Sequence, residues 1–377
     1  MTTETRVAIL ESVGIAMPYS KTKPLSIKSA ELDSPGPDEV LVKILAAGIC
    51  HSDLSVINGD RPRPTPMVLG HEAVGEVVKT GSNVSDLKNG VRVALVFVPS
   101  CGHCDFCSEG RPALCEPAFR ASIKGTLLSG GVRIRVAGKP VLHHLGVSCF
   151  ADFAVCHRRS LIPISPKTEP VVQAVFGCAV LTGCGSIIRT AKLDIGERVG
   201  IVGLGGVGLA ALLGARASGA GLIIAIDSDD SKKEISMQLG ADFFFNSLDP
   251  ESSPKIRDLT NGGVEIAAEF AGVMPALEFA LGITRRGGRT VSASLPNPSD
   301  RLSVPVAALV AEERSLLGSY VGSSIPSRDL PAYLSLHESG RLPVEKLITG
   351  TIRLNEINFG MQRLAEGEAV RQIVQFK

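Results

Sequence analysis

Four cysteines lie within fifteen residues of this 377-residue chain, with the spacing C-x2-C-x2-C-x7-C. They are Cys101, Cys104, Cys107 and Cys115. Thiolates at such short intervals can converge on a single Zn²⁺ in an all-sulfur shell. A closed shell leaves no ligand position for water or substrate. The cluster therefore predicts a structural zinc site in a lobe at about residues 99–116.

Two disulfides, or four unrelated buried thiols, are the alternatives to zinc. Disulfides require an oxidising compartment. The segment Met1–Pro18 lacks the basic flank, the apolar core and the small-residue cleavage site of a signal peptide. The total of nine cysteines is odd, which also favours thiols that bind metals or pack in a reducing environment. We therefore expect a cytoplasmic protein.

Length and charge narrow the class of function. A chain of this length is long for one hydrophobic core, so we expect two domains. The 39 basic and 38 acidic residues give a net charge of +1, and there is no Trp and no long basic run. Nucleic acids and anionic membranes therefore have no electrostatic support as partners. Val199–Ile226 could be mistaken for a membrane helix, but repeated glycines and Arg216 interrupt it. A small-molecule substrate is the better expectation.

The first 178 residues have the pattern of a β domain. Short β-branched runs alternate with Gly and Pro turns, and they include Glu39–Ile44, Gly75–Lys79 and Val91–Val98. This pattern predicts an antiparallel, barrel-like domain.

From about Ala179 apolar strands alternate with helix-sized segments, which predicts a parallel, doubly wound sheet with right-handed crossovers. The expected strands are Arg198–Gly203, Leu222–Asp227 and Val264–Glu269. After about Gly322 the chain returns to short mixed elements, ending in Ala369–Phe376. The predicted domains are therefore 1–178 with 322–377, and 179–321.

A G-x-G-x-x-G motif, formed by Gly203, Gly205 and Gly208, stands between an apolar strand and the helical segment Leu209–Ser218. Such glycines allow a tight turn, close approach to a pyrophosphate and close helix packing, with the phosphates at the helix N-terminus. Asp227 lies nineteen residues beyond Gly208, at the end of the next expected strand. A carboxylate there can bind both ribose hydroxyls and repels a 2′-phosphate, so NAD is predicted. An aspartate that only caps the following helix is the alternative.

Two further tracts contain residues that zinc accepts as ligands. Cys50–Asp53 (CHSD) follows the apolar run Val40–Ala47, and Gly70–Glu72 (GHE) follows a Pro-rich loop. Taken alone, a single buried Cys or His is more often a packing residue than a ligand.

Together these landmarks resemble the zinc-dependent medium-chain alcohol dehydrogenases, over essentially the whole chain. The resemblance implies a GroES-like β-barrel catalytic domain plus a Rossmann domain that binds NAD, with two zinc ions per chain. The landmarks that match, in family order, are Cys50–Asp53, Gly70–Glu72, the four-cysteine lobe, Gly177–Cys178, Gly203–Gly208, Asp227 and Arg371.

The resemblance also implies roles for single residues. Cys50, His71 and Cys178 would hold a catalytic zinc with an open fourth position, Asp53 would orient His71, and Glu72 would be an alternate ligand. Ser52 would pass the alcohol proton to the cofactor ribose. The implied cofactor contacts further include His51, Thr182, Lys232 and Arg371, and the implied substrate pocket is lined by Phe97, Leu145, Leu295 and Val321.

The activity implied is hydride transfer between NAD and a primary alcohol, medium-chain or aromatic, and its aldehyde. Gly125–Gly146 resembles the long insertion of dimeric members, which implies a homodimer. One alternative is an S-(hydroxymethyl)glutathione dehydrogenase, although Arg61 and Arg63 replace the acidic residues of that subclass. A non-catalytic NAD-binding redox sensor is another.

One departure from the family pattern is visible, and three histidines have no implied role. Ser55 stands where many relatives have a histidine that carries the proton to bulk water, and a hydroxyl has no pKa near neutrality. His143, His144 and His157 have no implied role, and we expect them to be surface or interface residues.

Overall fold

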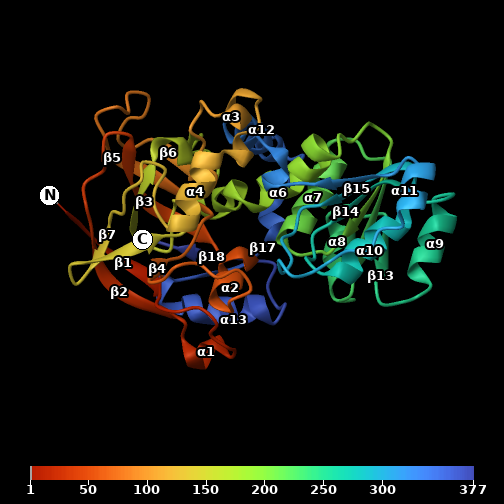
Figure 1. The fold of residues 1–377 in the computed structure, drawn as a ribbon, viewed down its shortest axis with the longest axis horizontal. Coiled ribbons are helices and arrows are strands. Elements are labelled where there is room, and N and C mark those ends of the chain that lie inside the picture. Colours follow the sequence, from red (N-terminus) through yellow and green to blue (C-terminus); the bar gives the residue numbers. More distant parts are fainter. Residues whose placement is uncertain (1) are drawn as a thin grey trace. The chain divides into compact units, whose positions relative to one another are not determined.

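A computed structural model, in which Thr2–Lys377 are described, separates into two compact units (Figure 1). The first unit comprises Met1–Cys178, Ile325–Leu334 and Ile348–Lys377, and the second comprises Ala179–Ser324 and Ser335–Leu347. The sequence predicts that 322–377 belong to the first domain as one piece. The structure differs because η6 (Val344–Leu347), whose Val344 and Leu347 are fully buried, packs against a helix of the second unit.

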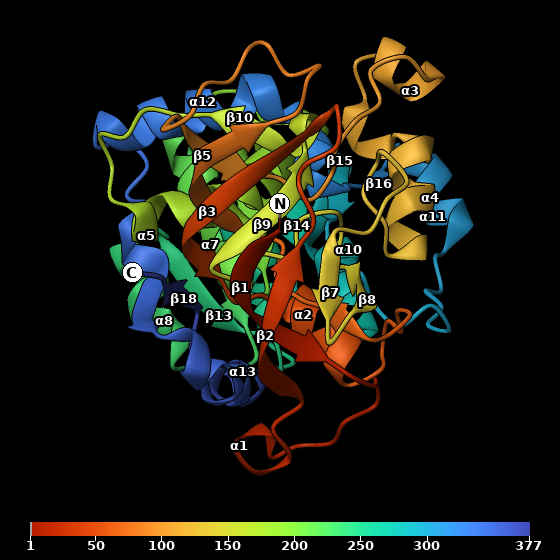
Figure 2. The same ribbon diagram turned by 90° about the vertical axis from the view of Figure 1, so that its left-hand side faces the viewer.

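The first unit contains a closed barrel and a larger sheet, as a GroES-like fold requires. In Figure 2 the hairpin β7–β8 lies beside β2 on the barrel. The barrel order is β1 (Thr3–Leu10), β2 (Leu25–Leu32), β7 (Ile134–Val136), β8 (Lys139–His143), β4 (Met67–Val68). The sheet order is β10 (Leu161–Pro163), β6 (Arg92–Leu95), β5 (Ala73–Thr80), β3 (Glu39–Gly48), β18 (Arg371–Gln375), β17 (Ile348–Ile352), with β9 (Phe153–His157) also paired to β3.

Strand β3 is the centre of this unit. Its apolar, β-branched run favours a strand, and it pairs with β5, β9 and β18. Pairing on both sides buries it almost completely, with Ile44 at the centre of a core that also includes Leu69 and Phe150. Strands from the N-terminal and the C-terminal segments of the first unit therefore meet on β3. This pairing fixes the position of Gly48, the last residue of β3, and so of the residues that follow it.

The second unit is a six-stranded, entirely parallel sheet, as predicted. Its order is β13 (Phe243–Asn246), β12 (Leu222–Asp227), β11 (Arg198–Val202), β14 (Val264–Glu269), β15 (Thr284–Ser292), β16 (Ser315–Gly318). Counted from β11 this is the doubly wound order 3-2-1-4-5-6, in which the chain reverses direction between β11 and β14. Dinucleotides bind at such a reversal, beyond the carboxyl ends of the strands.

The helices are mostly short. Among the described residues no single helix is long and apolar enough to cross a membrane, and one bent pair, Pro170–Gly177 with Ala179–Thr190, meets the length and composition requirement together. The α-helices are α1 (Tyr19–Thr22), α2 (His51–Ile57), α3 (Asp105–Ser108), α4 (Glu116–Lys124), α5 (Pro170–Gln173), α6 (Ala179–Gly185), α7 (Gly206–Ala217), α8 (Lys232–Gln238), α9 (Ser252–Leu259), α10 (Met274–Ile283), α11 (Val306–Ala311), α12 (Pro326–Glu338) and α13 (Ile357–Ala365).

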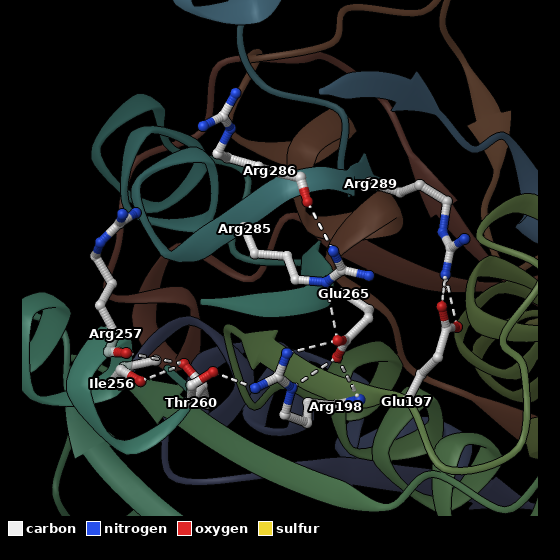
Figure 3. A network of polar contacts seen from close by, with 9 residues as sticks. All are labelled: Glu197, Arg198, Ile256, Arg257, Thr260, Glu265, Arg285, Arg286 and Arg289. Atoms are coloured by element: carbon white, nitrogen blue, oxygen red, sulfur yellow. Dashed lines mark hydrogen bonds and ion pairs between the residues drawn. The ribbon is translucent and has the colours of Figure 1, made fainter. Parts of the chain in front are cut away.

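An ionic network connects the starts of three strands in the second unit (Figure 3). Glu265, at the start of β14, accepts hydrogen bonds from Arg198 of β11 at 2.6 Å and from Arg285 of β15 at 2.9 Å. Burial opposes the ionisation of Glu265, but the hydrogen bonds from Arg198 lower its pKa to about 2. Arg289 and Glu197 form a second pair beside it at 2.6 Å. The network holds neighbouring strands in register.

Replacing Glu265 by Gln should lower the melting temperature of the protein. The lost charge leaves two arginines without their partner, which costs about 2 kcal/mol, or about 4–8 °C for a unit of this size. The folded-state pKa of Glu265 lies below the ordinary 4.5. Its stabilisation is therefore complete above about pH 4.5 and is lost as the pH falls toward 2. Calorimetry from pH 7 to 3 should show the gap to wild type narrow; Glu278→Gln, an exposed carboxylate of α10, should show no gap.

Candidate active site

Three potential metal ligands come from distant segments of the first unit. Cys50 follows β3 and adopts an extended backbone just before α2. His71 stands just before β5, and Cys178 follows η3 (Ala174–Gly177). All three side chains are buried, and their ligand atoms lie within 4.8 Å of one another. The structure thus brings together the three residues that the family resemblance implies as ligands of a catalytic zinc.

The imidazole of His71 is oriented by a carboxylate. Its Nδ1 lies 3.2 Å from Oδ1 of Asp53, which also accepts a hydrogen bond from the backbone N–H of Gly70 at 3.0 Å. The opposite nitrogen, Nε2, is buried without a hydrogen-bond partner in the described part of the chain. Buried polar atoms are almost always satisfied. An orphaned nitrogen beside two sulfurs therefore fits a zinc ion, in the carboxylate–histidine–metal arrangement.

The electrostatics of this group favour a cation. A hydrogen bond from Cys178 and the positive charges of Arg371 and His71 lower the pKa of Cys50 well below its ordinary value, against the effect of burial. Burial disfavours a charged His71, yet the charge and hydrogen bond of Asp53, together with Cys50, raise its pKa well above the ordinary range. The same negative groups that would hold a proton on His71 attract a metal ion in its place.

Glu72 and Arg371 form a buried ion pair beside these ligands. Oε2 of Glu72 lies 3.6 Å from Nη1 of Arg371, which also donates to the carbonyl of Ile49 at 3.3 Å. Burial raises the pKa of Glu72 to about 7, although the charge of Arg371 opposes the rise. The carboxylate of Glu72 is thus placed where it could bind the metal if the coordination changed. Arg371, predicted as a pyrophosphate contact, makes its described contacts inside the first unit.

The four clustered cysteines also converge. The Sγ of Cys107 lies 3.5 Å from that of Cys104 and 4.0 Å from that of Cys101, and the four sulfurs lie within 4.8 Å of one another. A tetrahedral Zn–S shell requires separations of about 3.8 Å. All nine cysteines are free thiols, so the described residues contain no disulfide. The geometry fits zinc and not the disulfide alternative.

The glycine motif of the second unit is explained by backbone geometry. Gly203 has a φ of +89°, and a Cβ on Gly208 would collide with the carbonyl of Gly203. A Cβ on Gly205, by contrast, would meet nothing within 4 Å. The turn itself therefore requires glycine at 203 and 208, whereas Gly205 leaves open space at the start of α7. That space fits the approach of a diphosphate.

Asp227 ends β12 beside this turn. Its Oδ2 accepts a hydrogen bond from the backbone N–H of Leu204 at 2.6 Å, and its Oδ1 accepts one from Asp229 at 3.0 Å. Both oxygens are thus held by the glycine loop and the following turn. The next helix, α8, has Ser231 at its N-cap, so Asp227 does not cap it. Lys232 lies near, with Nζ 3.7 Å from Asp229.

The other predicted residues are distributed over both units. In the first, Ser52 is half-buried and His51 exposed at the start of α2, and the Phe97 ring meets the His71 ring edge to face at 5.1 Å. Leu145 is half-buried with a φ of +52°. The second unit holds the buried Thr182 and Val321 and the exposed Leu295.

Two histidines are not where we expected them. His143 and His144 are almost completely buried, so the prediction of surface positions is wrong for both. Nε2 of His143 accepts a hydrogen bond from the backbone of Arg133 at 3.0 Å. His144 packs on the candidate metal site, with Nε2 3.6 Å from Oδ1 of Asp53. The signal available in the sequence was that the pair directly extends the apolar strand Val141–Leu142. His157 is half-buried.

Comparisons with known proteins agree with this architecture. Residues 36–166 match the family model of the alcohol dehydrogenase GroES-like domain, and residues 206–339 match that of zinc-binding dehydrogenases. An S-(hydroxymethyl)glutathione dehydrogenase of Escherichia coli O1:K1 / APEC is 32% identical over 365 residues, which are 96% of this chain and 99% of the relative.

Solved structures of dehydrogenases are also similar to this chain. Benzyl alcohol dehydrogenase from Acinetobacter calcoaceticus has a TM-score of 0.92 at 28% identity, over 100% of both chains. A protein of the zinc-binding dehydrogenase type from Sinorhizobium meliloti 1021, solved with NADP bound, has a TM-score of 0.80 at 25% identity and covers 99% of this chain and 100% of its own. Both the predicted fold class and the family resemblance are confirmed. The chain belongs to the zinc-dependent medium-chain alcohol dehydrogenases.

Proposed function

We propose that this protein is an NAD-dependent dehydrogenase that interconverts a primary alcohol and its aldehyde in the reducing cytoplasm. The observation that carries the proposal is the orphaned Nε2 of His71, buried beside the sulfurs of Cys50 and Cys178. A three-ligand set of this kind leaves one position for substrate. Zinc held there would acidify an alcohol and polarise an aldehyde. The four-cysteine lobe would hold a second, structural zinc.

Support for NAD comes from Asp227. Its carboxylate, held by Leu204 and Asp229 at the end of β12, suits two free ribose hydroxyls and repels a 2′-phosphate. The S. meliloti relative was solved with NADP, so the preference depends on this chain's own residues. We also propose Thr182, Lys232 and the glycine loop as cofactor contacts.

The substrate class is drawn from two kinds of relative. The similarity to benzyl alcohol dehydrogenase supports an aromatic alcohol as the substrate of this chain. The ring of Phe97 beside His71 suits contact with an aromatic substrate. The E. coli relative acts on S-(hydroxymethyl)glutathione, which is the second candidate. Arg61 and Arg63 stand where the glutathione-dependent subclass has acidic residues, so we favour the aromatic substrate. A non-catalytic sensor would have no need of a complete ligand set.

The first test is metal content and activity. We expect two zinc per chain by elemental analysis and NADH formation from benzyl-type alcohols, with NAD used better than NADP. Cys178→Ser should retain one zinc and the wild-type melting temperature but lose at least about 100-fold in kcat/KM. Cys104→Ser should instead lose the other zinc and lower the melting temperature. The opposite assignment of these two losses would refute our division between the sites.

Proton release must follow an unusual route. Ser52 lies in the first turn of α2, where it can receive the alcohol proton. The hydroxyl of Ser55 donates to the carbonyl of His51 at 2.7 Å and accepts from Nη2 of Arg61 at 3.0 Å. Its proton and one of its two lone pairs are thus engaged, and a guanidinium does not deprotonate in proteins. Neither Ser55 nor Arg61 can act as a proton carrier, so the proton must leave through water or buffer.

Turnover should therefore increase with the concentration of imidazole buffer at fixed pH and ionic strength, because a mobile base replaces the missing internal carrier. Ser55→His should remove this dependence by restoring an imidazole at that position. Steady-state rates in imidazole and in a bulky buffer of equal pKa would measure the effect. Equal rates in both buffers for the wild-type enzyme would contradict the proposed route.

A homodimer is supported by the free edge of the second unit. In the described residues β16 pairs only with β15, and neighbouring α11 has no buried residue. Val306, Val310 and Leu316 are exposed there. An unpaired strand edge flanked by apolar side chains suits the addition of the same strand from a second copy.

Val310→Glu should convert the dimer to a monomer, because it places a charge in the apolar contact. Val310 is 71% exposed, so the fold of the chain itself should be unaffected. Light scattering measures the mass, and Leu248→Glu, equally exposed near the opposite sheet edge, is the control. A wild-type protein of monomer mass at micromolar concentration would exclude the proposal.

A further inference from the structure

Four hydroxyl side chains form a continuous hydrogen-bonded chain in the second unit. Oγ of Ser186 lies 3.0 Å from Oγ of Ser319, which lies 2.7 Å from Oγ1 of Thr190. Oγ1 of Thr190 is in turn 2.9 Å from Oγ of Ser323. The series begins at the exposed Ser323 and ends at Ser186, which is completely buried. We call these four residues the hydroxyl chain.

The direction of every hydrogen bond in the hydroxyl chain follows from its inner end. Oγ of Ser186 donates to the carbonyl of Thr182 at 2.6 Å. A hydroxyl has a single hydrogen, so Ser186 can only accept from Ser319. By the same rule Ser319 accepts from Thr190, and Thr190 accepts from Ser323. All four hydroxyls therefore donate inward, and the last acceptor is the main chain of Thr182, a residue proposed above as a cofactor contact.

The inner half of the hydroxyl chain lies on an unusual helical turn. The segment η4 (Ser186–Thr190) is π-helical. The N–H of Ala191 donates to the carbonyl of Ser186 at 2.9 Å, one residue further back than in an α-helix. Single π turns are rare and occur often at functional sites. Here the turn presents two hydroxyls, from its first and last residues, to Ser319.

The outer half of the hydroxyl chain holds a strained segment. All three residues of η5 (Val321–Ser323) have a positive φ, which is +52° at Val321. Left-handed backbone is rare for a β-branched residue and persists only where surrounding contacts impose it. Ser319 and Ser323, on the two sides of Val321, both bond to Thr190. One threonine hydroxyl thus holds both ends of the strained turn.

The strained segment lies directly on α6. A Cβ on Gly322 would be 2.4 Å from the carbonyl oxygen of Leu181 and 2.8 Å from that of Thr182. Oγ of Ser324, the residue after η5, donates to the same Leu181 carbonyl at 3.2 Å. Only glycine permits so close an approach. The positions of Val321 and Thr182 therefore depend on one another.

The place of this contact in the sheet selects one end of a dinucleotide. Asp227 ends β12, in the half of the sheet formed by β11, β12 and β13, where it suits the adenosine ribose. Ser319 directly follows β16, in the other half, and its N–H donates to the carbonyl of Ser292 at the end of β15 at 2.9 Å. A dinucleotide lies across the two halves. The segment 319–323 therefore belongs to the nicotinamide half.

We propose that Ser319 and Thr190 are positioning residues for the nicotinamide. The hydroxyl chain holds Val321 against the turn that carries Thr182, and these two residues bound the nicotinamide end of the cofactor. The inference rests on the NAD-dependent function proposed above. Ser319 and Thr190 act by fixing a backbone conformation that is unfavourable on its own. Contacts that are fixed in advance bind a ligand without the cost of ordering them.

The test compares NADH with ADP-ribose, which keeps the adenosine and the diphosphate but has no nicotinamide. In calorimetry on the full-length, zinc-loaded protein, Thr190→Val should weaken NADH binding about fivefold, the effect of one lost hydrogen bond. ADP-ribose binding should not change. Valine keeps the shape of threonine, so the variant should fold, and Ser319→Ala should show the same selective loss. Equal weakening of both ligands, or of neither, would overturn the inference.

Thr260→Val is the matched control. Its hydroxyl is buried and donates to the carbonyl of Ile256, and its own carbonyl accepts from Arg198 at the start of β11, the opposite end of the strand from the glycine loop (Figure 3). This variant should lower the melting temperature as Thr190→Val does and change the binding of neither ligand. A loss of NADH binding alone in the control would overturn the inference.

The exposed end of the hydroxyl chain should matter less. In Ser323→Ala, water can donate to Thr190 in place of the lost hydroxyl, so NADH binding should stay close to that of the wild type. A loss as large as that of Ser319→Ala would overturn the inward direction of the hydrogen bonds.

Single-turnover kinetics give a second readout. The rate of NADH formation from a benzyl-type alcohol should fall in Thr190→Val, because a misplaced nicotinamide slows hydride transfer, and should be unchanged in Thr260→Val. Equal rates in wild type and Thr190→Val would refute the positioning role and leave the NAD-dependent function intact. A wild-type protein that binds neither NADH nor ADP-ribose would instead refute the proposed cofactor.

Discussion

The contact between Nδ1 of His71 and the carboxylate of Asp53 determines how the candidate site is built. It selects the ring orientation that leaves Nε2 toward the two sulfurs, and it does so where both partners are fully buried. Because Asp53 also accepts from the backbone of Gly70, one carboxylate couples α2 to the start of β5. Cys50, at the entrance of α2, is positioned by the same coupling.

The charges around that contact require a cation. Two thiols and the carboxylates of Asp53 and Glu72 share a dry volume in which Arg371 is the permanent positive charge. Uncompensated buried charges cost several kcal/mol each. A divalent ion on Cys50, His71 and Cys178 would balance these charges.

Features that depend on residues close together in the sequence could be predicted from it. The burial of side chains by distant parts of the chain could not. The cysteine spacing, the glycine turn and the strands around Asp227 depend on residues a few positions apart, so their chemistry is readable in the chain. The burial of Arg371 depends on β18 pairing with β3, more than 300 residues away. His144 was misjudged for the same reason, since Asp53 and His71 reach it only through tertiary folding. The segment 335–347 lies in the second unit and not, as expected, in the first, because its placement depends on the tertiary contact of η6 with α7.

Ser55 connects the missing proton carrier to Arg61 in the loop 58–63. A histidine there would carry protons; a serine is small enough to receive the guanidinium of Arg61 and to donate to the turn behind it. The replacement that removes the proton carrier therefore also fixes the guanidinium of Arg61 against the end of α2.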